Sequence, residues 1–248
     1  MAPRQTRRRR ATKRTFKRRV NRKSLYRVAR RVAYQIAETK YYETGVVTPD
    51  ITSNGLWSQQ SGDAAHLSQN VWARLDLLNG ILVGNTNSTR VGNRIMVKYV
   101  QVYLAIGQGD ATDLESGTCR FLLIRDKGTQ GSLIDMRNSY FSTNGPMLSG
   151  QTMPINAPKN SDTLRRYSTL LDRQHSVQTY GNTTGSKTAT PVMTFYIPVN
   201  RVFTYKAGTS GWNSSDCMVE ETLQFALGAD MAGCCNISAY FRVAYKDA

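Results

Sequence analysis

The sequence predicts an all-β protein, an antiparallel sandwich or barrel, preceded by a strongly basic arm. Three observations lead to this prediction. Several short runs alternate apolar and polar residues with the period-two spacing of strands. Polar, glycine-containing loops such as SGQTMPINAPKNSD and GNTTGSKTATP separate these runs. Strand-like runs do not alternate with helical ones, as a parallel sheet with crossover helices would require.

The strongest strand signal is RIMVKYVQVYLAIG, residues 94–107, which is rich in β-branched and aromatic residues. Period-two alternation assigns one face to Met96, Lys98, Val100, Val102, Leu104 and Ile106, and the other face to Ile95, Val97, Tyr99, Gln101 and Tyr103. CRFLLIRDKG, residues 119–128, repeats the type and ends in a charged turn.

Two further segments read as strands nearer the end of the chain. PVMTFYIPVNRVFTY, residues 191–205, is interrupted by Pro198, which suits an edge strand or a bulge. CCNISAYFRVAYKDA closes the chain with an alternation of Ile237, Ala239, Phe241, Val243 and Tyr245. DTLRRYSTLLDRQHSV, residues 162–177, fits a helix about as well as a strand on spacing alone.

Charge divides the chain into two parts. Residues 4–31 contain fifteen Lys and Arg without one acid, and the first acid is Glu38. Of the 33 bases and 17 acids in the chain, the remaining residues hold 18 bases and 17 acids, so the net charge of +16 belongs almost wholly to the N-terminal part. We therefore expect a basic arm over residues 1–40 and one nearly neutral domain over residues 41–248.

The end of the arm changes from polycation to amphipathic helix. Helical spacing over residues 25–38 aligns Leu25, Val28, Ala29, Val32, Ala33 and Ile36 in one stripe, and Ser24 can cap the start. Such a basic helix can lie on a membrane surface, but this stripe lacks Phe and Trp and is partly alanine, which disfavours that use. Because no apolar run approaches about twenty residues, we expect no membrane insertion.

Motifs of enzymatic chemistry are missing from the sequence. There is no GxxxxGK[ST] loop, GxSxG or HExxH, and the two histidines, His66 and His175, do not stand at the spacing of a metal-ligand motif. His175 lies near Asp172 but is better read as an ordinary polar residue than as a general base. The four cysteines have no paired CxxC spacing and are expected to be reduced thiols. We expect no enzymatic activity, no cofactor and no metal.

Dense Arg and Lys predict a phosphate backbone as the partner of the arm, through counterion release and bidentate Arg contacts. The candidate nucleic-acid-binding residues are Arg4, Arg7, Arg8, Arg9, Arg10, Lys13, Arg14, Lys17, Arg18, Arg19, Arg22, Lys23, Arg27, Arg30 and Arg31. With only Phe16 and Tyr26 as aromatics before residue 32, the arm offers few stacking platforms. A nuclear import signal, which needs about five to eight basic residues, can use the same segment.

Specific segments resemble the single jelly-roll capsid proteins of small viruses with circular single-stranded DNA genomes, the circovirus-like group. STRVGNRIMVKYVQVYLAI is similar to that group's R-x-G element and first long strand, and RFLLIRDKGTQG to the next strand and turn. RRYSTLLDRQHSV is similar to a later strand, which favours strand over helix there, and YFRVAYKDA to the terminal strand.

This resemblance implies eight antiparallel strands in a jelly roll and an icosahedral shell of sixty copies. It also implies packaging of single-stranded DNA by the arm, and residence in the virion and, during assembly, in the host nucleus with help from an import receptor. Two alternatives stay open. Small RNA viruses and satellites use a similar shell and arm, and a cellular β-domain of ribosomal or chromatin type can carry a similar basic tail.

Overall fold

The computed structural model describes residues 28–29, 32, 37–49, 57–58, 65–66, 72–108, 116–128, 134, 136–142, 157–178, 192–205, 221–229 and 235–248. The chain divides into two compact units, Met1–Ile36 and Ala37–Ala248. In the first unit, Val28, Ala29 and Val32 have helical backbone conformation. Ala37 and Glu38, which the predicted helix included, are not helical, and its other residues lie outside the described ones.

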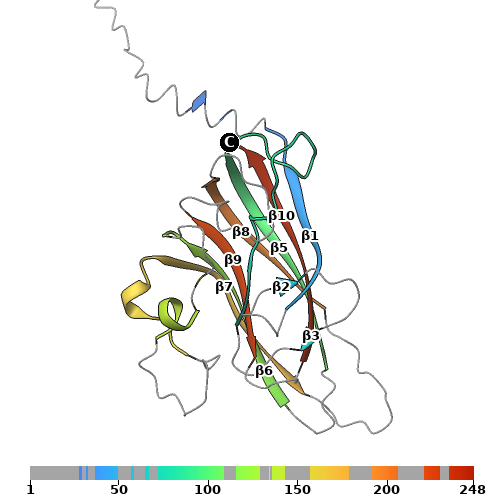
Figure 1. Ribbon diagram of the computed structural model, residues 1–248, viewed down its shortest axis with the longest axis vertical. Helices are drawn as coiled ribbons and strands as arrows, with labels where there is room; N and C mark the ends of the chain where they lie inside the picture. The colour runs from blue at the N-terminus through green and yellow to red at the C-terminus, as the bar shows by residue number, and fades with distance from the viewer. Residues whose placement is uncertain are drawn as a thin grey trace, which may run out of the picture. The chain divides into compact units, whose positions relative to one another are not determined.

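The second unit consists of two antiparallel sheets packed face to face, so the predicted β-sandwich is confirmed (Figure 1). One sheet has the order β1-β10-β5-β8, formed by Lys40–Pro49, Cys235–Asp247, Arg94–Gln108 and Val192–Thr204. The other has the order β4-β9-β6-β7, formed by Trp72–Asp76, Thr222–Ala229, Ser116–Asp126 and Tyr167–Gln178. Two short strands, β2 (Trp57–Ser58) and β3 (Ala65–His66), pair with β1 and β10.

The eight long strands pair in a nested order. β6 pairs with its neighbour in sequence, β7, while β5 pairs with β8, β4 with β9, and β1 with β10. The chain therefore behaves as a long antiparallel ribbon folded back on itself, with the first and last strands as its outermost pair. Residues 162–177, ambiguous in sequence, form a short 3-10 turn at Ser161–Thr163 followed by strand β7, as the resemblance favoured.

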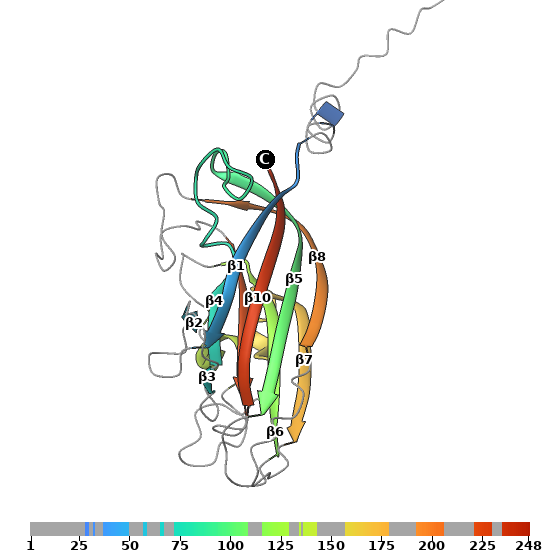
Figure 2. The ribbon, with the colours of Figure 1, turned by 90° about the vertical axis from the view of Figure 1, so that its right-hand side faces the viewer.

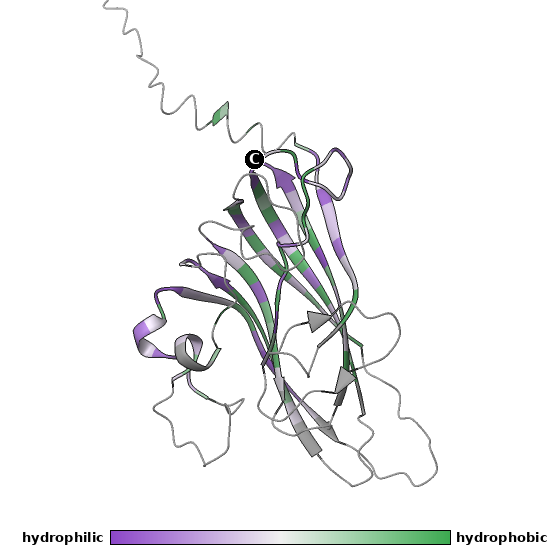
Figure 3. Cartoon of the chain, in the orientation of Figure 1, coloured by the Kyte–Doolittle hydropathy of each residue, from purple (hydrophilic) through white to green (hydrophobic). Residues whose placement is uncertain are grey.

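Between the sheets lies one large apolar core. Its aromatic contacts join strands of opposite sheets: Phe225 of β9 meets Phe241 of β10 with ring centroids 4.8 Å apart, and Phe121 of β6 meets Phe195 of β8 at 5.2 Å. The alternating residues predicted in β10, from Ile237 to Tyr245, are all buried. The alternation of green and purple along the strands shows the same pattern (Figure 3).

The predicted facing of β5 is correct in its second half and wrong in its first. Val100, Val102, Leu104 and Ile106 are buried as expected, but Ile95 and Val97 are buried too. The reason is a β-bulge of β5 against β10: Val97 and Tyr99 pair with the adjacent residues Tyr245 and Ala244, so Lys98 is an extra residue that resets the alternation. Pairing with β8 also shifts register here, because β8 has one extra residue between the partners of Val97 and Tyr99. Pro198 lies beside this bulge on β8, which is the last strand of its sheet, so both predicted contexts for Pro198 are observed.

The outer face of the β4-β9-β6-β7 sheet, called the covered face below, is buried under the connection from β6 to β7 (Figure 1). That connection includes a π-helical turn, Met136–Tyr140, and contributes Ile134, Met136, Tyr140, Phe141 and Ala157 to a second apolar cluster. Trp72 of β4 packs on Phe141 with centroids 5.0 Å apart. A Cβ on Gly228, opposite Trp72, would come within 2.9 Å of the indole, so the close packing requires glycine there.

Candidate nucleic-acid interface

All fifteen candidate nucleic-acid-binding residues, Arg4 to Arg31, lie outside the described residues. The candidate surfaces that the structure describes therefore lie on the sandwich. The relevant surface is the outer face of the β1-β10-β5-β8 sheet. Figure 2 shows this face, and none of the described segments crosses in front of its strands.

Five tyrosines from four strands share this outer face, which we call the tyrosine face: Tyr41, Tyr99, Tyr103, Tyr196 and Tyr240. Strand register arranges the face in three rows. The first row is Tyr41, Ala244, Tyr99 and Pro198. The second is Glu43, Arg242, Gln101 and Tyr196, and the third is Val46, Tyr240, Tyr103 and Thr194.

The tyrosines form pairs rather than standing alone. The rings of Tyr99 and Tyr196 have centroids 4.5 Å apart, and those of Tyr103 and Tyr240 meet edge to face at 5.5 Å. Such cross-strand aromatic pairs stabilise a sheet modestly and restrict the rotamers of both rings. Tyr41 and Tyr196 remain 44% and 60% exposed, so their rings are accessible to a ligand.

A polar group occupies the middle of the tyrosine face. The Nε of Arg242 donates to Oε1 of Glu43 at 2.7 Å. Hydrogen bonds from Tyr240 first, and then from Arg242, hold the pKa of Glu43 below its usual range. Burial and a hydrogen bond with Tyr41 raise the pKa of Tyr99. The phenol of Tyr99 is therefore a neutral hydrogen-bonding group at neutral pH.

Basic side chains flank the face at the end where β1 begins. Lys246 of β10 pairs with Met96 of β5 in the next row, and Arg94 starts β5 in the row beyond. Lys40, the first residue of β1, is held by Asp247 at 2.8 Å and donates to the carbonyl of Thr89 at 2.9 Å. The first strand is therefore fixed at the point where the basic arm joins the sandwich.

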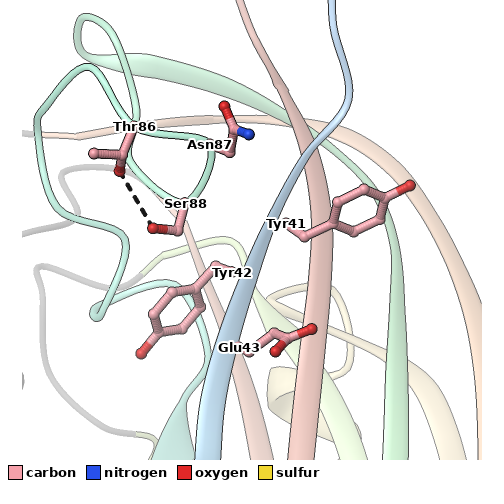
Figure 4. A pocket seen from close by; sticks show the side chains of 6 residues that line it. All are labelled: Tyr41, Tyr42, Glu43, Thr86, Asn87 and Ser88. Carbon is pink, nitrogen blue, oxygen red and sulfur yellow. Dashed lines mark hydrogen bonds between the residues drawn. The ribbon is translucent and has the colours of Figure 1, made fainter.

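An open groove of about 720 Å³ lies where β1 passes the turn at residues 86–88 (Figure 4). Tyr41 and Tyr42 point to opposite sides of the strand, and the backbone amide of Tyr41 donates to the carbonyl of Asn87 at 3.2 Å. Glu43 is the one acid in the lining and already pairs with Arg242. The groove offers hydrogen-bonding groups beside the tyrosine face rather than a paired acid and base.

The R-x-G element of the sequence, Arg90 to Gly92, has a structural role. Arg90 is fully buried, and its guanidinium lies 4.0 Å from the ring centroid of Tyr205. It donates to the carbonyls of Ile81 and Gly92, and Gly92 has a φ of 84°, which glycine adopts without strain. These contacts fix the loop that enters β5, so Arg90 is unsuited to binding phosphate.

In the described part of the chain, Asp172 and Glu221 both pair with arginines. Asp172, near His175, accepts two hydrogen bonds from Arg120, at 2.8 and 2.9 Å, and these contacts hold the pKa of Asp172 below its usual range. Glu221 pairs with Arg125 at 2.6 Å, while Glu220 lies outside the described residues. Cys119 is a buried thiol that forms no disulfide. In the described part of the chain, no cluster of three metal-ligating side chains occurs.

Among the described residues, no helix is long and apolar enough to cross a bilayer. No protein-family model matches the chain, and a search of curated proteins finds no match.

Sequence reasoning missed the tyrosine face as a surface. The alternation of β5 placed Tyr99, Gln101 and Tyr103 together, opposite an apolar face, and that part is correct. Tyr41, Tyr196 and Tyr240 come from distant segments, and only the strand order and register bring them beside β5.

Proposed function

We propose that this chain is a viral capsid protein that assembles into a small icosahedral shell and packages single-stranded DNA through its basic arm. The observation that carries the proposal is the division of the chain: a polycation without acids, followed by a nearly neutral β-sandwich. The nested strand pairing supports the jelly-roll part of the proposal. The sequence resemblance to circovirus-like capsid proteins supplies the shell of sixty copies and the DNA genome.

Charge separation suits the two tasks of such a protein. A nearly neutral sandwich lets subunits approach one another without strong repulsion, while concentrated positive charge attracts phosphate. Sixty arms with fifteen charges each would carry about 900 positive charges, which would neutralise a like number of phosphates. In this proposal the protein resides in the virion and passes through the host nucleus during assembly, and the same basic residues can serve for import.

Removing residues 2–23 tests the proposal, because it deletes twelve of the fifteen bases and lowers the net charge from +16 to +4. We expect the intact chain to form nucleic-acid-filled particles in electron micrographs and the truncated chain to form empty particles, fewer particles or none. The slope of log affinity against log salt for single strands should become shallower by about 5 to 8, since each phosphate contact contributes about 0.7.

A matched control replaces every Arg among the twelve by Lys, which keeps the charge and should keep packaging. Nucleic-acid content per subunit, read from absorbance, and binding titrations at several salt concentrations give the answer. Small monomers from the intact chain would favour the cellular β-domain instead. Equal nucleic-acid content in intact and truncated protein would contradict packaging by the arm. Sequencing of the packaged strands separates a DNA genome from the RNA alternative.

A further inference from the structure

The tyrosine face has the chemistry of a platform for unpaired bases. Nucleic-acid-binding sheets place aromatic side chains on the exposed face of adjacent strands, where two or three bases stack. Here five tyrosines lie on four adjacent strands, on the side away from the core. Stacking on aromatic rings tolerates any sequence, since every base has a π-face, and this suits a protein that packages a whole genome.

Polar groups beside the rings can contact base edges. Tyrosine hydroxyls supply donors and acceptors, and the guanidinium of Arg242 can stack on a base while still paired with Glu43. Gln101 lies between Arg242 and Tyr196 in the middle row, but its amide oxygen is buried and does not serve as an acceptor for a base. The face therefore combines flat apolar surfaces with edge-reading groups.

The composition of the middle row argues against a second copy of the chain as the occupant. The cores of homodimer interfaces are depleted in charged residues and are more apolar than the rest of the surface. The centre of the tyrosine face instead holds the Glu43–Arg242 ion pair, whose side chains are 44% and 37% exposed. A solvated nucleic-acid strand tolerates such a pair better than a dry protein interface does.

Chain connectivity places the arm within reach of this face. Tyr41 in the first row is the tenth residue after Arg31, the last base of the polycation. A chain of ten residues spans at most about 35 Å, so nucleic acid bound by the end of the arm lies within that distance of Tyr41. Two basic residues of the sandwich, Lys246 and Arg94, lie at the end of the sheet where β1 begins.

We infer that the tyrosine face binds single-stranded nucleic acid by stacking its bases, while the arm neutralises the phosphates of the same strand. This inference rests on the proposed function, because it assigns the arm's ligand to the sheet as well. In an assembled shell, the tyrosine face then points toward the genome.

The test separates bases from phosphates. The probes are a labelled oligo-dT of about twelve nucleotides, within the site sizes of single-strand-binding domains, and an abasic strand of equal length and charge. Stacking of one base is worth about fivefold to 150-fold in affinity. We expect the intact chain to prefer oligo-dT over the abasic strand by about tenfold or more at fixed salt.

The variant Tyr41→Ser with Tyr196→Ser should bring this preference close to one while leaving the salt slope unchanged. The matched control, Tyr41→Phe with Tyr196→Phe, keeps the rings and should keep the preference. Photo-crosslinking of a strand carrying 5-iodo-deoxyuridine should give adducts at Tyr41 or Tyr196 in the intact chain. Oligo-rU in place of oligo-dT shows whether the face distinguishes RNA from DNA.

Each outcome has a clear meaning. Equal affinity of the intact chain for both strands overturns base stacking but leaves packaging by the arm standing. Failure to bind even the abasic strand instead contradicts the proposed function. An undiminished preference in the serine variant also overturns the inference. So does a serine variant that folds, retains the preference for oligo-dT and cannot assemble, because the face would then be a contact between subunits.

Discussion

The two outer faces of the sandwich differ in whether another described segment of the chain covers them. Every two-sheet sandwich has two faces that point away from the core. On the β4-β9-β6-β7 sheet, the covered face is apolar and is buried beneath residues of the β6–β7 connection. On the β1-β10-β5-β8 sheet, no described segment covers the tyrosine face, which is amphipathic. In our proposal, the covered face serves stability and the tyrosine face binds nucleic acid.

Ion pairs on the two faces differ in the same way. On the covered face, Asp126 is fully buried and accepts two hydrogen bonds from Arg166, each 2.8 Å long. On the tyrosine face, the Glu43–Arg242 pair is solvated. Breaking a buried pair leaves an uncompensated charge, whereas an exposed pair contributes little to stability. Substitutions on the two faces should therefore separate folding from binding.

The largest expected effect comes from the aromatic cluster of the covered face. Phe141 is fully buried. Its ring contacts Trp72 and Tyr140, and the guanidinium of Arg120 lies 5.3 Å from its centroid. Phe141→Ala should lower the free energy of unfolding by about 3 to 5 kcal/mol. Tyr196→Ala on the open face should change it by about 0.5 kcal/mol or less. Chemical unfolding of the intact chain measures both, and equal losses would contradict the contrast.

A smaller effect is expected from the carboxylates of the two faces. Asp172→Asn weakens the pair with the largely buried Arg120 and should cost about 2 kcal/mol at neutral pH. Glu43→Gln should cost less than about 1 kcal/mol, because that pair is exposed. Unfolding midpoints at pH 7 compare them directly.

The pH dependence of stability provides the second measurement on these variants. The pKa values of Asp172 and Glu43 are both lowered in the folded protein. The unfolded state then binds protons more readily, so the stability from each carboxylate is present above its ordinary pKa of about 4 and is lost as the pH falls below it. Asp172→Asn should reduce this loss of folding stability at acid pH more than Glu43→Gln does. Identical acid profiles for Asp172→Asn and the unmodified chain would show that the Asp172 carboxylate contributes nothing.

Much of the sandwich could be predicted because its core strands obey simple alternation. β10 alternates without interruption from Ile237 to Phe241 and on to Val243, so its buried side was readable directly. The first strand was harder to predict, since KYYETG has two adjacent tyrosines and a glycine and follows a helical pattern. β1 begins at Lys40, one residue before the predicted domain start.

The two outer faces could not be predicted, because both depend on contacts between distant segments. Arg120 and Asp172 are 52 residues apart, and nothing in RFLLIRD indicates a partner on β7. The tyrosine face likewise needs the order of four strands. A usable signal was present, since Tyr99, Tyr196 and Tyr240 each lie on the side of a strand opposite its apolar residues. Sequence pattern gave the side of each strand but not its neighbours.

The smallest expected effect concerns the bulge that shapes the tyrosine face. Val199 and Asn200 of β8 together face Lys98 of β5, and Asn200 has a φ of 49°. Asparagine tolerates this left-handed conformation better than alanine does, and glycine adopts it freely. Asn200→Ala should therefore cost about 1 kcal/mol of folding stability, while Asn200→Gly should stay within about 0.5 kcal/mol of the unmodified chain. Because the bulge sets Tyr99 beside Tyr196, Asn200→Gly should also keep the preference for oligo-dT. Unfolding curves and the two-strand titration measure these outcomes together. An alanine variant as stable as the glycine variant would mean that the backbone at Asn200 relaxes freely and that the bulge does not fix the face.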